Sequence, residues 1–168
     1  MIRILFVCMG NICRSPTAEG VVRGMAERAG VSALLEVDSA GTHGAHEGEA
    51  PDQRARKVAA SRGYDLSDMR ARRVKTQDFS RFDRILAMDH QNLAALRRSC
   101  PAEHLPKLGL FLEYGAGLAL DEVPDPYYGG IEGFEKVLDL CEQAAQGIVE
   151  AIAQPGLACG SESEAERL

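Results

Sequence analysis

The sequence of 168 residues contains no tryptophan, no internal repeat and no apolar run long enough to cross a membrane. Met1 leads directly into a predicted strand, without the segments of a signal peptide. Its five cysteines are odd in number and lack paired clusters, which excludes a disulfide framework and a zinc site. We therefore expect a protein of the reducing cytoplasm that does not enter a membrane.

The chain also lacks an excess of positive charge. Its net charge of −6 argues against a nucleic-acid partner. The charge is uneven, because positions 54–84 are rich in Arg and Lys, whereas acidic residues predominate from Glu113 onward. Two interpretations stay open. The two regions form solvated faces of opposite sign, which we favour, or the basic region steers acidic, phosphorylated partners toward the protein.

Length and composition indicate one ordinary globular domain with a sizeable core. Apolar runs typical of strands alternate with amphipathic segments typical of helices, and positions 65–80 are polar and irregular. The predicted strands cover 2–7, 34–39, 84–88 and 106–111, and the predicted helices cover 17–29, 52–62, 89–99 and 131–153. This alternation predicts an α/β fold: a four-stranded parallel sheet with helices on both faces. The predicted domain covers 1–154, and 155–168 is a predicted disordered tail.

The stretch VCMGNICRSP at positions 7–16 joins the first strand to the first helix. Five residues separate Cys8 from Arg14, and an arc of this length allows successive N–H groups to point at one anion. The helix N-terminus adds partial positive charge. Gly10 allows a close approach or a positive φ, and Asn11 tolerates the left-handed region. The predicted phosphate-binding loop consists of Met9, Gly10, Asn11, Ile12, Cys13, Arg14 and Ser15.

Cys8 would lie inside this positive cup, which favours its thiolate. A thiolate there can attack phosphorus and form a phosphocysteine, while Arg14 and the loop N–H groups hold the phosphate oxygens. Ser15 would donate a hydrogen bond to the thiolate, and with Pro16 it suits a helix start. The alternative is that Cys8 is a buried strand-end cysteine and Arg14 an exposed helix residue.

Expelling an alkoxide leaving group needs a proton donor, and Asp125 is the candidate. It could act first as general acid and then as base for the attacking water. Its alternative role is an Asx turn before Pro126. Asp52 is expected to cap the helix at 52–62, and Asp89 is expected to cap a helix rather than to catalyse. Cys8, Ser39 and Asp89 all lie at the carboxyl ends of predicted strands, at the edge of the sheet where ligands bind in such folds.

The sequence VCMGNICRSPTAE at 7–19 resembles the signature of the low-molecular-weight protein tyrosine phosphatases. DSAGT at 38–42, AMD at 87–89 and DPYYGG at 125–130 extend this resemblance to about residue 153. It implies an α/β fold, a phosphocysteine intermediate, Asp125 as general acid and phosphotyrosine proteins as substrates, with no metal or cofactor. It also implies that Ile12, His46, Tyr127 and Tyr128 line the substrate cleft. We expect a monomer.

The resemblance further implies that Asn11, Ser15 and Ser39 hold the loop in a strained shape. Members of the family often add a histidine to this network, and Met69 stands at that position here. This departure predicts a thinner network or a substitute partner.

Cys13 is implied to form a reversible disulfide with Cys8, which would protect the nucleophile from over-oxidation. Its alternative role is that of a small apolar packing residue. We favour the redox role, on the expectation that Cys13 is exposed and has thiolate character. Ala45 is a second departure, since bacterial members often have an aromatic cleft residue at this place. The predicted cleft wall is therefore more open.

Other activities share this fold. Phosphoarginine phosphatases tend to carry threonine where this chain has Ile12, so Ile12 and the pair Tyr127 and Tyr128 favour phosphotyrosine. Arsenate reductases need two further cysteines close together, and Cys100 has no such neighbour. A phosphopeptide-binding module without activity is the non-enzymatic alternative, and the presence of nucleophile, arginine and acid together argues against it.

Overall fold

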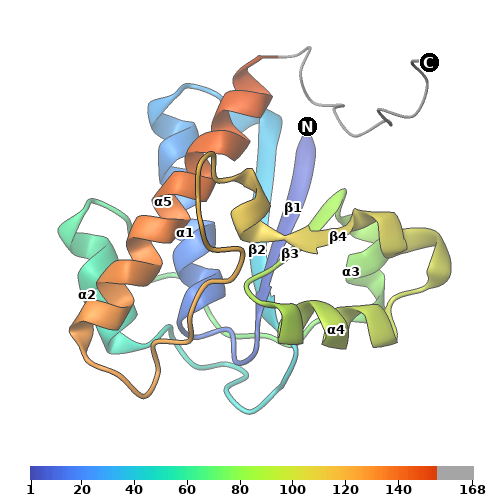
Figure 1. Ribbon diagram of the computed structural model, residues 1–168, viewed down its shortest axis with the longest axis horizontal. Coiled ribbons are helices and arrows are strands. Elements are labelled where there is room, and N and C mark those ends of the chain that lie inside the picture. Colours follow the sequence, from blue (N-terminus) through green and yellow to red (C-terminus); the bar gives the residue numbers. More distant parts are fainter. Residues whose placement is uncertain (155–168) are drawn as a thin grey trace.

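A four-stranded parallel sheet forms the centre of the molecule, as predicted (Figure 1). In this computed structural model, residues 1–154 are described. The strands lie in the order β2-β1-β3-β4. Their bounds are Ile2–Cys8 for β1, Leu35–Gly41 for β2, Arg84–Ala87 for β3 and Leu108–Leu110 for β4.

Helices cover both faces of the sheet, as predicted (Figure 1). One face carries α1 (Arg14–Arg28), α2 (Gln53–Ser61) and α5 (Ile131–Ala153), and the other carries α3 (Thr76–Arg81) and α4 (His90–Ser99). Three 3₁₀ turns lie at Ser32–Leu34, Ala102–Lys107 and Phe111–Tyr114.

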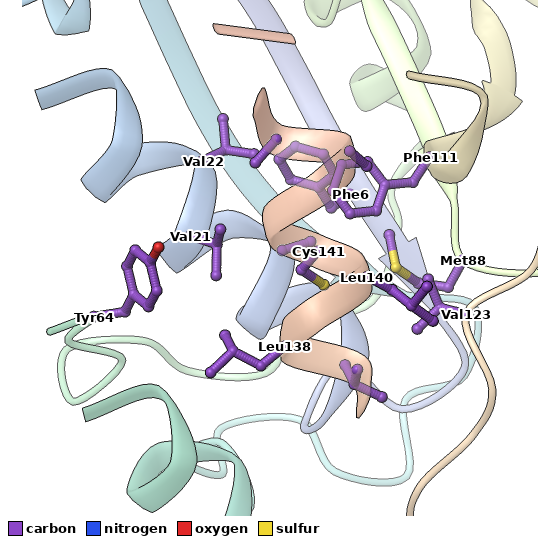
Figure 2. Packing of buried hydrophobic residues seen from close by; sticks show 14 of the residues in the cluster. Phe6, Val21, Val22, Tyr64, Met88, Phe111, Val123, Leu138, Leu140 and Cys141 are labelled. Carbon is purple, nitrogen blue, oxygen red and sulfur yellow. The ribbon is translucent and has the colours of Figure 1, made fainter. Parts of the chain in front are cut away.

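Successive residues of β1 enter two separate cores, because side chains alternate across a strand. Phe6 and Cys8 pack in the larger cluster with α1 and α5, whereas Leu5 and Val7 pack in the smaller one with α3 and α4. In Figure 2, α5 passes between the side chains of α1 and those near Met88. This alternation places the Cys8 side chain on the α1 side of the sheet.

Two predicted helix starts are confirmed by hydrogen bonds. Asp52 accepts from the N–H of Arg54 at 2.8 Å before α2, and Asp89 accepts from that of Asn92 at 2.7 Å before α4. The prediction that Ser15 starts the first helix is wrong. That helix begins at Arg14, and no side chain caps it.

The prediction of irregular structure throughout 65–80 is also wrong, since α3 begins at Thr76. This helix of six residues is too short to show an apolar period. It depends on one buried aromatic, Phe79, and on Asp78, whose carboxylate accepts from the N–H of Lys75 at 2.8 Å. The fourth strand is shorter than predicted, because 3₁₀ turns occupy both of its ends.

The described residues fall almost wholly within the predicted domain of 1–154. The predicted tail, 155–168, lies outside them, so the domain boundary stays a prediction. Across residues 1–154, no helix combines the length and hydropathy needed to span a membrane.

Candidate active site

A cleft of about 420 Å³ opens at the carboxyl ends of the central strands. Three segments line it: the loop after β1, the segment 43–46 after β2, and the loop that precedes α5. The structure therefore brings together the predicted nucleophile, arginine and acid. The lining residues are Cys8, Met9, Gly10, Ile12, Cys13, Arg14, His43, Ala45, His46, Asp125, Tyr127 and Tyr128.

Cys8 ends β1 and is only 2% exposed. Its Sγ lies 3.0 Å from the Oγ of Ser15, and the N–H of Asn11 donates to it at 3.3 Å. The backbone N–H is thus a donor to this sulfur, and the Ser15 hydroxyl can donate to it as well. Ser15 thus lies inside the helix and bonds to the cysteine, rather than to the start of the helix.

The loop between Cys8 and α1 keeps backbone donors available. Within residues 1–154, the N–H groups of Gly10, Ile12, Cys13 and Ser15 reach no protein acceptor at hydrogen-bond distance. Unpaired N–H groups at the start of a helix form an anion site, because the aligned peptide dipoles point their positive ends at it. The loop can therefore bind the oxygens of a phosphate.

Asn11 holds this loop in a left-handed conformation, with φ of 57°. The positive φ falls on Asn11 and not on Gly10. The Asn11 Nδ2 donates at 2.9 Å to the Oγ of both Ser15 and Ser39, and its Oδ1 accepts from the N–H of Arg72 at 2.9 Å. The backbone of Arg72 is thus a further partner of this network, and Met69, at the position of the family histidine, is buried.

Gly41 supports the same loop from the end of β2. A side-chain Cβ at Gly41 would lie 2.7 Å from the carbonyl oxygen of Met9 and 3.0 Å from that of His43. Only glycine allows this approach of backbone to backbone. Residues after β2 also bind the loop directly. The N–H of Thr42 donates to the Cys8 carbonyl at 2.9 Å, and the N–H of His43 donates to the Met9 carbonyl at 3.0 Å.

Arg14 is buried, so its alternative as an exposed helix residue is wrong: its side chain is 3% exposed. The Nη1 donates to the Oδ2 of Asp89 at 2.6 Å and to the carbonyl of Val123 at 3.1 Å. Its Nη2 lies 3.7 Å from the Oδ2 of Asp125. A guanidinium held on one side by a carboxylate keeps its remaining N–H groups aimed at the cleft.

Asp89 has two functions, of which the sequence shows one. Its Oδ1 caps α4, and its Oδ2 orients the guanidinium of Arg14. The pair joins residues 75 positions apart. Its only sequence signal is that Asp89 follows a predicted strand, at the edge of the sheet where Cys8 also lies.

Asp125 is about half exposed at the mouth of the cleft. Its Oδ1 accepts from the N–H of Tyr127 at 3.1 Å, which is an Asx turn, and its Oδ2 faces Arg14. The two alternatives for this residue are therefore compatible, because one oxygen forms the turn while the other faces the cleft.

The loop that carries Asp125, residues 121–130, is here called the acid loop. The N–H of Val123 donates to the Met88 carbonyl at 2.8 Å. Further along, Arg54 donates to the carbonyls of Tyr127 at 3.1 Å and Gly129 at 3.3 Å. Arg54 also binds the carboxylate of Asp52, and that hydrogen bond lowers the Asp52 pKa.

Through these contacts the acid loop is joined to the phosphate-binding loop. The N–H of Asp52 donates to the carbonyl of Ile12 at 2.7 Å. Asp52 and Arg54 thus connect the loop that holds the nucleophile to the loop that holds the acid. Sequence reasoning identified Asp52 as a helix cap only and missed Arg54.

One group of residues within 1–154 places three potential metal-binding atoms within 4.8 Å of one another: His90, Asp121 and Glu122. All three are exposed. His90 Nε2 lies 2.7 Å from Asp121 Oδ2, and this hydrogen bond raises the His90 pKa. The group lies outside the cleft lining and fixes the start of the acid loop to α4.

The outer wall of the cleft is aromatic on one side only. The Tyr127 ring lies 4.9 Å from that of Tyr128 and 6.4 Å from that of His46, between ring centroids. Tyr128 is 94% exposed, so it stands free at the rim. Ala45 lines the cleft with a methyl group, and the more open wall stays a prediction.

Cys13 does not fit the exposed thiolate on which its redox role was argued. It is 6% exposed, and burial, reinforced by the nearby charge of Asp52, raises the pKa of its thiol to about 12. At neutral pH it is therefore a protonated, buried thiol that lines the floor of the cleft.

Comparison with known proteins identifies this arrangement. Residues 3–156 match the family model described as "Low molecular weight phosphotyrosine protein phosphatase". The chain belongs to this family. A low molecular weight protein-tyrosine-phosphatase of Streptomyces coelicolor is 49% identical over 154 residues, which cover 89% of this chain and 93% of that protein. Membership of the family makes the chain a protein-tyrosine-phosphatase.

Two solved structures show the same fold. A protein tyrosine phosphatase from Entamoeba histolytica superposes with a TM-score of 0.87 at 40% identity, over 91% of this chain and 97% of that one. Vibrio vulnificus Wzb, solved in complex with benzylphosphonate, superposes with a TM-score of 0.77 at 31% identity, over 89% and 97%.

Behind the catalytic loop of this phosphatase lies a buried carboxylate that the sequence reasoning did not find. Glu19 is 5% exposed and accepts from Ser39 Oγ at 2.6 Å. It pairs with Arg23, and Asp38 and Asp68 are the other charged groups near it. Burial raises its pKa to about 7.

Glu19 should make the stability of the protein depend on pH. Between its ordinary pKa of 4.5 and about 7, the native chain holds a proton that the unfolded chain has lost. The free energy of unfolding therefore falls as the pH rises through this window, by on the order of 3 kcal/mol in all. We predict that Glu19→Gln removes this fall, as measured by urea denaturation at pH 5 and pH 7.5.

The matched control is Glu27→Gln on the same helix, at an exposed position. It should keep the pH dependence of the parent chain. An unchanged dependence in Glu19→Gln would contradict the assignment of the fall to Glu19.

Proposed function

We propose that this chain hydrolyses phosphotyrosine in proteins through a phosphocysteine at Cys8. The observation that carries the proposal is the position of one buried sulfur beside one buried guanidinium. Cys8 Sγ accepts from the N–H of Asn11 and lies 3.0 Å from the Ser15 Oγ, while Arg14 is fixed by Asp89 at the same cleft. A nucleophile beside a preorganised oxyanion site fits phosphoryl transfer.

In the first step the Cys8 thiolate attacks phosphorus. An S–P bond forms as the bond from phosphorus to the tyrosine oxygen breaks. Asp125 gives its proton to that oxygen, so the leaving group departs as a neutral phenol. Arg14 and the N–H groups of the loop hold the three equatorial oxygens throughout.

In the second step the Asp125 carboxylate takes a proton from water. The water oxygen bonds to phosphorus, the S–P bond breaks, and phosphate leaves. The electron pair returns to Cys8 as a thiolate, which the Ser15 hydroxyl stabilises by its hydrogen bond at 3.0 Å. Asn11 and Ser39 keep the loop in place for both steps.

Phosphotyrosine is favoured over phosphoarginine by the lining of the cleft. Ile12 and Tyr127 give it apolar and aromatic surface suited to a phenyl ring. Benzylphosphonate, the compound bound to the related Wzb, carries a phenyl ring and a phosphorus oxyanion as phosphotyrosine does. Arsenate reduction is disfavoured, because Cys100 lies outside the cleft lining.

The proposal extends to the state of the protein and to the second cysteine of the loop. The chain acts as a monomer in the cytoplasm and needs no metal or cofactor. A peroxide oxidises Cys8 to a sulfenic acid and is itself reduced to water or an alcohol; the sulfenic acid then condenses with the Cys13 thiol and releases water to form a disulfide. The buried, protonated state of Cys13 makes this condensation slow.

Substrate choice is tested by side-by-side hydrolysis of two peptides that differ only in phosphotyrosine or phosphoarginine. We predict that kcat/KM is at least about tenfold higher for the phosphotyrosine peptide, which corresponds to about 1.4 kcal/mol of preferred transition-state binding. Cys8→Ser should abolish turnover of both. Equal or faster release of phosphate from phosphoarginine would overturn the assignment.

The role of Asp125 is tested by the leaving group. Asp125→Ala should slow cleavage of phenyl phosphate, a poor leaving group, by about 10²- to 10⁴-fold. It should slow p-nitrophenyl phosphate much less, because p-nitrophenolate departs without a proton. Rapid-quench measurement of the phenol released in the first turnover gives the comparison. Equal slowing for both would exclude Asp125 as the acid.

A further inference from the structure

A second hollow, of about 590 Å³, lies beside the catalytic cleft on the α3 and α4 side of the sheet. It is here called the basic groove. Its walls come from residues 42–43 after β2, residues 73–79 around the start of α3, and residues 95–99 of α4. Figure 1 shows α3 and α4 together on this face.

The basic groove carries positive charge and no negative charge. Arg73, Lys75 and Arg98 line it, and its lining contains no aspartate or glutamate. Within the described chain, the charged nitrogens of these three side chains have no carboxylate oxygen within 4.0 Å, and the Asp78 carboxylate accepts from the backbone N–H of Lys75 rather than from its ammonium group. The neighbouring Arg72 shows the contrast, because it pairs with two carboxylates, those of Asp38 and Asp78. In a chain of net charge −6, three unpaired cations in one hollow stand out.

The groove continues the catalytic cleft. His43 lines both hollows. Its N–H donates to the carbonyl of Met9 in the phosphate-binding loop, and that of Thr42 donates to the carbonyl of Cys8. A peptide whose phosphotyrosine occupies the cleft can therefore follow this wall into the groove. One carboxylate, that of Glu47, lies beside this wall and accepts from the backbone N–H of Arg73 at 3.2 Å.

We propose that the basic groove binds an acidic segment of the substrate, close in sequence to the phosphotyrosine. Carboxylates of Asp or Glu would pair there with the cations at 73, 75 and 98. This inference rests on the proposed function and adds a preference among phosphotyrosine proteins. Exposed ion pairs stabilise modestly and weaken with salt, so the groove should raise kcat/KM for acidic substrates by about tenfold at low ionic strength.

The test uses three phosphotyrosine peptides: one with neutral flanks, one with glutamates before the phosphotyrosine, and one with glutamates after it. We expect one acidic peptide to exceed the neutral peptide in kcat/KM by about tenfold in 20 mM salt and by less than about threefold in 500 mM salt. Arg98→Glu should remove most of that preference.

Arg97→Glu is the matched control. It makes the same change of charge at the adjacent, exposed position of α4 but does not line the groove. It should keep the preference, and both variants should turn over p-nitrophenyl phosphate as the parent chain does. This substrate is too small to reach the groove, so it reports an intact catalytic site.

Several outcomes would overturn the inference. Equal kcat/KM for acidic and neutral peptides, with p-nitrophenyl phosphate still hydrolysed, would refute the binding of acidic segments in the groove. The proposed function would not be affected. If Arg97→Glu and Arg98→Glu reduced the preference for the acidic peptide equally, the preference would come from the general electrostatic field of α4 and not from a binding site in the groove. Binding of the chain to phosphatidylserine vesicles that Arg98→Glu removes, without any peptide preference, would assign the groove to a membrane surface. Failure on every phosphotyrosine substrate would refute the proposed function itself.

Discussion

The site depends on one strained residue and the hydrogen bonds that hold it. Asn11 has a φ of 57°, which costs a non-glycine residue about 1–3 kcal/mol unless its surroundings compensate. Its amide side chain donates to Ser15 and Ser39 and accepts from the Arg72 backbone, so every strong hydrogen-bonding group on it is used. With the backbone curled in this way, the Asn11 N–H meets Cys8 Sγ while the following N–H groups stay unpaired for an anion.

The fold brings the rest of the chemistry to this loop by ending parallel strands at one edge. β2 ends in Gly41, which allows the backbone of the phosphate-binding loop to approach closely. β3 leads to Asp89, whose carboxylate fixes Arg14. The acid loop is then held by backbone contacts rather than by regular structure. Asp52 and Arg54 join it to the phosphate-binding loop, so nucleophile and acid share one hydrogen-bonded frame. The two hollows at this edge have different linings: the catalytic cleft has the aromatic side chain of Tyr127, and the basic groove has the cationic side chain of Arg73.

Local features of the sequence were enough to predict the sheet, the long last helix and the caps at Asp52 and Asp89. Periodicity and turn chemistry depend on residues that are close together in the sequence. The pairs that complete the site were not predictable in this way. Arg14 meets Asp89 across 75 positions, and the Asn11 side chain meets Arg72 across 61. Burial is likewise a property of the assembled fold, and for that reason the exposure assumed for Cys13 was wrong. The short α3 lacked a periodic signal altogether.

The central claim is that phosphate passes through Cys8, and trapping the intermediate tests it most directly. The chain, mixed with a phosphotyrosine peptide, is quenched in acid within the first turnovers and digested for mass spectrometry. The account predicts one phosphate on the peptide that contains Cys8, its absence in Cys8→Ser, and its disappearance once substrate is exhausted. Release of phosphate during steady turnover with Cys8 unmodified at every quench time would contradict the account.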